Sequence, residues 1–344
     1  MKNTRNSNIE LLRLLCILGI VILHSVGMVF QVTGINRAIS VTAISIFNSC
    51  VSVFMLISGY YGCKFKVSKL FRLEFQMLFY SLLSFVILGI YTTCWSKLSL
   101  LLALLPMSTK EFWYITVYMI IFMLSPYINR VAEGLDRKQF KKLILIMIFC
   151  FSILSTLEWC DITGDGGKGV PNMLLMYFIG QYIHLYHDEH KNPWKMFLYA
   201  CIVFAISSGL NFAVSAVNGE SGWKCIFSND NSISVVLGST FLFLCFKNIN
   251  IESRIINHFA KGVSGVYMSE KLIRTLLVAY VFPPNYAEKW YFSFFILAYA
   301  AFVVLTGLII DLLRQLIFNR PEIKVSELCE NILHKLTKGH IVDE

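Results

Sequence analysis

The chain has 344 residues, of which 56% are hydrophobic and 15% charged, and its formal net charge is +9 at pH 7. About 25% of the residues of a soluble domain are charged, and the mean hydropathy here is +0.64. This composition excludes a single soluble core and indicates a polytopic membrane protein. The positive charge does not indicate a nucleic-acid partner, because Lys and Arg lie in short segments between apolar runs.

Ten apolar runs predict an all-α protein with about ten transmembrane helices. With the N-terminus inside, the predicted inner segments hold 21 Lys and Arg and the outer segments hold 6. This asymmetry predicts that both the N- and C-termini are cytoplasmic. The predicted spans are residues 9–30, 40–61, 74–94, 112–128, 141–157, 171–186, 194–217, 232–247, 262–282 and 290–313.

The predicted domains are a helical membrane domain, residues 1–314, and a cytoplasmic C-terminal tail, residues 315–344. Within the tail, residues 321–338 carry apolar side chains near helical spacing. This pattern is compatible with an amphipathic helix on the inner membrane surface. A solvated tail without a function is the alternative.

The first predicted span carries Arg13 and, 11 residues later, His24. At about 100° per residue the two share one helix face, separated by about 16 Å along the axis. Glu10 can pair with Arg13 at i, i+3. Because ionisable groups are costly in lipid, this stripe is expected to face a protein-lined or wet cavity.

Two interpretations exist for each of these polar residues. His24 suits a general base near pH 7, or it is a packed, hydrogen-bonded histidine of the bundle. Arg13 can hold a donor phosphate or orient His24 through intermediate groups. Alternatively, Arg13 is paired with Glu10 as an anchor at the inner headgroups.

The Arg-x(10)-His spacing, with an acidic residue three positions before the Arg, resembles the membrane acyltransferase-3 family. Two further segments are similar to family motifs: residues 46–61, which end in Ser-Gly-Tyr-Tyr, and residues 112–129, which contain Trp-Tyr and Pro-x-x-Asn. The resemblance implies transfer of an acyl group, usually acetyl, from coenzyme A to a sugar hydroxyl of a cell-surface glycan. It also implies a bacterial plasma-membrane enzyme, with His24 as the base and acetyl-CoA or another acyl-CoA as donor.

A basic segment follows the second predicted helix and matches the family's basic inner loop. Its cations can bind the phosphates of coenzyme A, although the positive-inside rule alone also explains them. The predicted donor-binding residues are Lys64, Lys66, Lys69 and Arg72.

Three residues are candidates for substrate binding. Ser58 can donate a hydrogen bond, or it is a small residue at a helix contact. Trp113 and Tyr114 can stack on a sugar acceptor, or they belong to the aromatic belt of the outer interface. Gly59, next to Ser58, is expected to allow either a close contact between two helices or a turn of the backbone.

The late segment from Lys261 to Arg274 resembles a family motif but carries Glu270 where family members commonly have a histidine. Glu270 can replace that histidine as a polar partner in the site. It can also mark a different acceptor, a relative without activity, or a structural ion pair with Arg274 at i, i+4.

We therefore predict an O-acyltransferase that acts on a polysaccharide or lipid-linked sugar, surrounded by membrane lipids, with no metal. A transporter or flippase of a lipid-linked glycan, or an inactive family relative, is the alternative. The ten cysteines show no metal-binding spacing. Cys160 and Cys225 both fall in predicted outer loops, where a disulfide can form.

Overall fold

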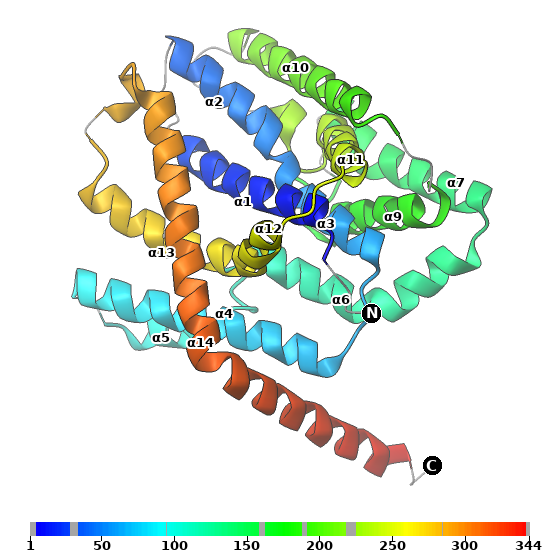
Figure 1. The fold of residues 1–344 in the computed structure, drawn as a ribbon, viewed down its shortest axis with the longest axis vertical. Coiled ribbons are helices and arrows are strands. Elements are labelled where there is room, and N and C mark those ends of the chain that lie inside the picture. Colours follow the sequence, from blue (N-terminus) through cyan, green and yellow to red (C-terminus); the bar gives the residue numbers. More distant parts are fainter. Residues whose placement is uncertain are drawn as a thin grey trace.

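The computed structural model describes residues 5–27, 34–93, 95–157, 162–187, 191–217, 225–283 and 285–341, and within these ranges it is helical without β-strands (Figure 1). A π-helical turn, η1 (Phe149–Ile153), joins α7 to α8. Short 3-10 turns are η2 (Ile226–Ser228), η3 (Ala260–Gly262) and η4 (Tyr286–Glu288). The α-helices are α1 (Ser7–Gly27), α2 (Gly34–Phe47), α3 (Ser49–Tyr61), α4 (Val67–Thr92), α5 (Lys97–Ala103), α6 (Trp113–Gly134), α7 (Arg137–Ile148), α8 (Leu154–Leu157), α9 (Val170–Tyr186), α10 (Pro193–Val217), α11 (Ile233–Lys247), α12 (Arg254–Phe259), α13 (Val263–Tyr280) and α14 (Phe292–Ile341).

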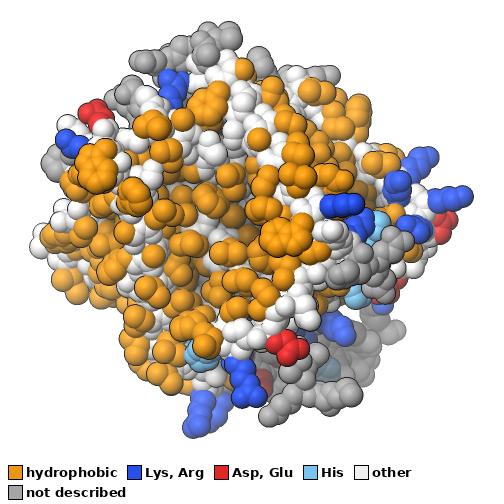
Figure 2. Space-filling view, turned by 45° about the horizontal axis from the view of Figure 1, so that its top comes forward, with side chains coloured by type: hydrophobic (Ala, Val, Ile, Leu, Met, Phe, Trp, Pro, Cys, Tyr) orange, Lys and Arg blue, Asp and Glu red, His pale blue; other side chains and the backbone are white. Residues whose placement is uncertain are grey.

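The helices confirm an all-α polytopic membrane protein. Among the described residues, seven helical segments are long and apolar enough to cross a membrane. Each of the ten predicted spans coincides with a helix, and the three beyond those seven are α9, α11 and α13. Hydrophobic side chains cover most of the face in Figure 2, and charged ones gather near its edges. The number of spans and the side on which each terminus lies remain predictions.

Helix α1 lies in the middle of the helices and carries the predicted polar stripe (Figure 1). It contacts α2, α3, α11, α13 and α14. Apolar side chains on several of its faces are buried, including Leu12, Cys16, Ile17, Ile20 and Val21. Helix α1 is therefore packed by protein on several sides, and of its ionisable residues Glu10 is buried whereas Arg13 and His24 are partly exposed.

Helices α3 and α9 pack so closely that the backbone of one contacts the backbone of the other. A Cβ atom at Gly59 would lie 2.0 Å from the Tyr177 carbonyl oxygen, and one at Gly180 would lie 2.2 Å from the Leu56 carbonyl oxygen. Only glycine fits such a contact. Of the two alternatives for Gly59, the structure shows the close helix contact, within α3.

Helix α14 continues without interruption past residue 314, where the predicted tail begins, and contains Pro321. Its C-terminal half extends beyond the other helices in Figure 1. The tail is therefore helical as far as Ile341. Its placement on a membrane surface remains a prediction.

Candidate functional site

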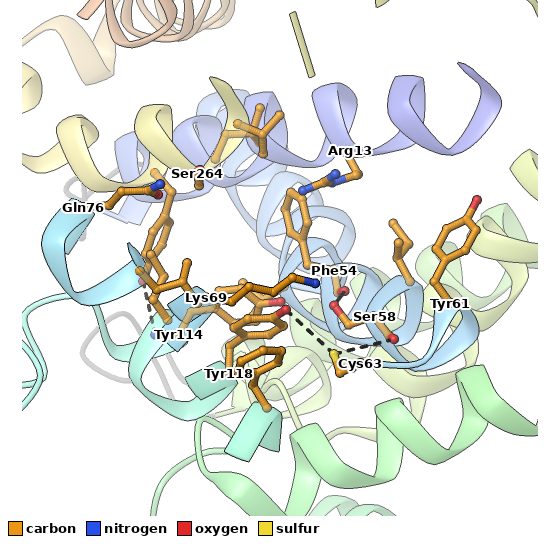
Figure 3. Close-up of a pocket in the computed structure, with 18 of the residues that line it drawn as sticks. Arg13, Phe54, Ser58, Tyr61, Cys63, Lys69, Gln76, Tyr114, Tyr118 and Ser264 are labelled. Carbon is orange, nitrogen blue, oxygen red and sulfur yellow. Dashed lines mark hydrogen bonds between the residues drawn. The ribbon is translucent and has the colours of Figure 1, made fainter. Parts of the chain in front are cut away.

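A cavity of about 580 Å³ lies between α1, α3, α4, α6 and α13 (Figure 3). Its volume is in the range of about 300–1,000 Å³ that is usual for ligand sites. The residues around it come from these five helices and from the connection between α3 and α4. The bundle thus assembles one site from several separate segments of the chain.

Four of the predicted site cations line this cavity. They are Arg13, Lys64, Lys69 and Arg72. In Figure 3, Arg13 and Lys69 extend toward the space between the helices. Lys66 does not line the cavity: it has an extended backbone just before α4 and is exposed. The sequence-predicted basic segment and Arg13 therefore meet in one place.

Apolar and tyrosine side chains form the rest of the cavity. The Tyr114 ring lies 6.2 Å from the Phe54 ring and 6.1 Å from the Tyr267 ring. The Tyr114 backbone N–H donates a hydrogen bond to the Tyr267 hydroxyl over 3.3 Å. Ile20 also lines the cavity and precedes His24 by about one turn, or about 6 Å along the axis. The cavity wall that α1 forms therefore ends one helical turn before His24.

His24 lies beyond the cavity lining and contacts Glu270. Its Nδ1 is 3.1 Å from Glu270 Oε2, and Glu270 Oε1 is 2.9 Å from Arg274 Nε. The Glu270 side chain is only 4% exposed, whereas that of His24 is 35% exposed. Since a carboxylate accepts hydrogen bonds, Nδ1–H donates to Glu270, and the lone pair of a neutral imidazole in this position is on Nε2. This arrangement orients the imidazole and leaves Nε2 as its basic atom.

Glu10 holds Arg13 at the cavity from within the same helix. Arg13 Nη1 lies 3.4 Å from Glu10 Oε2, at the i, i+3 spacing that the sequence predicts. Arg5 Nη1 lies 3.5 Å from the other oxygen, Oε1. Glu10 is buried and does not line the cavity. It is placed to position Arg13 rather than to contact a ligand in the cavity.

The predicted substrate-binding residues lie in different surroundings. Ser58 lines the cavity, and its hydroxyl donates to the Phe54 carbonyl oxygen over 2.9 Å. Tyr114 lines the cavity, but its neighbour Trp113 does not. The Trp113 ring instead has Lys168 Nζ 5.8 Å from its centroid. Trp113 therefore lies beside the cavity, next to the loop before α9.

That loop packs against the segment before α11. Asp230, in this segment, is 4% exposed, and the Asn172 side chain donates to its carbonyl oxygen over 3.0 Å. Burial raises the pKa of Asp230 to about 7; the charges of Lys168 and His24 oppose this rise, and that of Asp165 adds to it. No motif or spacing in the sequence singles out Asp230. The structure places it within electrostatic reach of His24.

Several cavity residues were not predicted from the sequence. Tyr118 follows Tyr114 by one turn, so an aromatic stripe on α6 was a usable signal. Tyr267 precedes Glu270 by three residues and shares its helix face. Cys63 gives no sequence signal; its thiol lies 3.8 Å from the Tyr118 hydroxyl.

Asn129, from the Pro-x-x-Asn motif, fixes the segment that contains Cys63. Its side-chain amide donates to the Cys63 carbonyl oxygen over 2.9 Å. Its oxygen accepts from the Tyr177 hydroxyl at 2.9 Å and from Gln181 Nε2 at 2.7 Å. The motif thus positions the turn at the end of α3, which forms part of the cavity wall. The predicted partner of Cys225, Cys160, lies outside the described residues.

Within the described part of the chain, no group of three or more His, Cys, Asp or Glu side chains could hold a metal ion. No curated protein and no solved structure shows a significant match to the chain. A family model described as an acyltransferase domain matches residues 6–317. The chain therefore belongs to the acyltransferase-3 family and is a multi-pass membrane acyltransferase.

Proposed function

We propose that this protein transfers an acyl group, in the first instance acetyl, from acyl-CoA to a hydroxyl of a cell-surface polysaccharide or lipid-linked sugar. The membrane is the bacterial cytoplasmic membrane. The observation that carries the proposal is the cavity, which combines Arg13 and the basic segment with a wall that ends one turn before His24.

The cavity has a basic wall and an aromatic wall, which suit the phosphates and the pantetheine thioester of an acyl-CoA. Its phosphates need cations with several donors, which Lys69 and Arg72 supply. Its pantetheine arm and thioester need a narrower, less polar path, which Phe54 and Tyr114 border. A donor bound from the cytoplasm would therefore point its thioester toward His24.

His24 and Glu270 would carry the chemical step. His24 Nε2 takes the proton of the acceptor hydroxyl as its oxygen attacks the thioester carbonyl. Glu270 holds Nδ1–H and stabilises the imidazolium that forms, and Arg274 balances the carboxylate. When the carbon–sulfur bond breaks, the proton passes from Nε2 to the departing thiolate. The products are the sugar ester and coenzyme A.

The acceptor would approach from the side of His24 opposite the basic segment. Trp113 offers an aromatic face for a sugar ring there. Lys168 and Asp230 supply polar groups near the same end of the bundle. By the predicted topology this is the outer side of the membrane, where cell-surface glycans lie.

The test is transfer from radiolabelled acetyl-CoA to bacterial envelope glycans by purified protein in nanodiscs. His24→Ala is expected to lower the rate at least about 10²-fold, the usual contribution of a general base. The matched control is His258→Ala, because His258 is exposed and lies outside the cavity lining.

Equal transfer rates in the wild type and in a folded His24→Ala variant would reject His24 as the base. Binding of the glycan without any release of coenzyme A from the wild type would instead support the transporter alternative.

A further inference from the structure

We infer that the C-terminal half of α14 completes the donor site: Asn319 and Glu322 are positioning residues that hold the Arg72 guanidinium at the cavity. The inference rests on the proposed function, because it assigns Arg72 to donor binding. It gives part of the segment predicted as a tail a role in donor binding. The evidence is a chain of contacts from the cavity wall into α14.

Arg72 is the cavity residue that reaches α14. Its Nη2 donates to Asn319 Oδ1, and its Nε lies 3.9 Å from Glu322 Oε2. Beside these contacts, the rings of Phe79 and Phe318 lie 5.3 Å apart. The polar contacts are therefore supported by packing between α4 and α14.

A buried ion network fixes Glu322. Arg314 is 3% exposed, and its guanidinium pairs with Asp311 at 2.9 Å and with Glu322. The Tyr80 hydroxyl of α4 donates to Asp311 over 2.8 Å. Buried charges keep such geometry because an unpaired partner is strongly unfavourable. Glu322 is therefore a fixed carboxylate rather than a mobile surface acid.

The same network touches the α13 wall of the cavity. A Cβ atom at Gly265 would lie 2.4 Å from the Asp311 Cβ and Cγ atoms. Gly265 follows Ser264, which lines the cavity. The network thus joins α4, α13 and α14 at the cationic part of the site.

The Arg72 side chain retains hydrogen-bonding capacity for a ligand. A guanidinium has five N–H donors, and within the described residues the contacts to α14 involve only Nη2 and Nε. Nη1 can therefore face a donor phosphate. The side chain is 40% exposed, and Arg has high rotamer entropy that fixed partners reduce before binding. Asn319 and Glu322 would thus strengthen donor binding without contacting the donor.

The experiment measures KM for acetyl-CoA, kcat and the dissociation constant of coenzyme A for the full-length protein in nanodiscs. Asn319→Leu removes the acceptor of Arg72 Nη2 without removing a partner of Arg314. Glu322→Gln removes the facing charge, and Glu322→Asp keeps it. The control is Glu327→Gln, an exposed acid on the same helix.

Asn319→Leu is expected to raise KM and the dissociation constant about tenfold, the value of one hydrogen bond to a charged group. Glu322→Gln removes an ion pair at 3.9 Å without a hydrogen bond and is expected to raise both by a smaller factor. The kcat of both variants should stay within about twofold of the wild type, and Glu322→Asp should recover part of the affinity. Adding Asn319→Leu to Arg72→Ala should weaken binding no further.

The outcomes separate the inference from the proposed function. Suppose that Arg72→Ala weakens coenzyme A binding, whereas Asn319→Leu and a folded Glu322→Gln variant bind coenzyme A like the wild type. The inference about α14 is then wrong, and the assignment of Arg72 to the donor site is retained. If wild-type protein neither binds nor turns over acetyl-CoA, the proposed function is wrong and the inference falls with it. The inference is supported if Arg72→Ala and Asn319→Leu each weaken coenzyme A binding and the double variant binds no more weakly than Arg72→Ala alone.

Discussion

His24 and Glu270 are separated by 246 residues in sequence, and their side chains meet at 3.1 Å. The family resemblance leads us to expect a histidine at the position of Glu270. The observed contact is the one that the interpretation of Glu270 as a polar partner in the site requires: it pairs a carboxylate with an imidazole that lies one helical turn beyond the cavity. A structural ion pair with Arg274 alone would not require the contact to His24.

Glu270→Gln is expected to lower kcat about 10²-fold, because the amide cannot stabilise an imidazolium as a carboxylate does. KM for acetyl-CoA should change little, since Glu270 does not line the cavity. Steady-state kinetics in nanodiscs check this. Glu288→Gln, a change at an exposed acid, is the control. An unchanged kcat would leave Glu270 as a structural partner of Arg274.

Phe54→Ala is expected to widen the cavity beside Tyr114 and to admit longer acyl chains. Each added methylene group in an apolar pocket changes specificity by about tenfold or more. The ratio of kcat/KM for butyryl-CoA to that for acetyl-CoA should therefore rise at least about tenfold. Phe302→Ala, on an exposed position of α14, should leave the ratio unchanged. A ratio that moves equally in both variants contradicts the assignment of Phe54 to the acyl path.

Arg314→Met is expected to destabilise the folded protein by about 3–5 kcal/mol, because it leaves Asp311 and Glu322 as buried charges without their cation. Thermal unfolding in detergent measures the effect. Arg320→Met removes an exposed cation from the same helix and should change the unfolding temperature little. Similar unfolding temperatures for the two variants would show that the network contributes little stability.

The stability of the protein should depend on the ionisation of Asp230. Its folded-state pKa of about 7 exceeds the unfolded value of about 3.9, so the folded state binds the extra proton between these values. The associated stability is present in full below about pH 4 and is lost as the pH rises through about 7.

Asp230→Asn should therefore raise the unfolding temperature relative to the wild type at pH 8, and raise it less at pH 5. Differential scanning fluorimetry of both proteins at the two pH values measures this. Glu133→Gln, at an exposed acid, controls for net charge. The same difference at both pH values would contradict a raised pKa of Asp230.

Short-range spacing accounts for much of what could be predicted from the sequence. Helical periodicity alone places Glu10 beside Arg13. The apolar runs predict the helices because a membrane span has a nearly fixed length. Composition and periodicity act over a few turns, so they do not require knowledge of which helices are neighbours.

Other site features depend on tertiary contacts or on helix rotation. Trp113 and Tyr114 are adjacent, and since successive residues point about 100° apart only Tyr114 faces the cavity. Lys69 and Arg72 share one face of α4, whereas Lys66 precedes the helix. The contact between Arg72 and Glu322 depends on the crossing of α4 and α14, which no local pattern specifies.

The two sides of the cavity are held in different ways. On the α3 side, Gly59 and Gly180 leave no free space between α3 and α9, so this wall is held by a contact between backbones. On the α4 side, the wall is held through side chains, because Tyr80 donates to Asp311 and Arg72 contacts Asn319 and Glu322 of α14. The shape of the basic side of the cavity therefore depends on the side chains of α14, whereas the opposite side depends on two glycines.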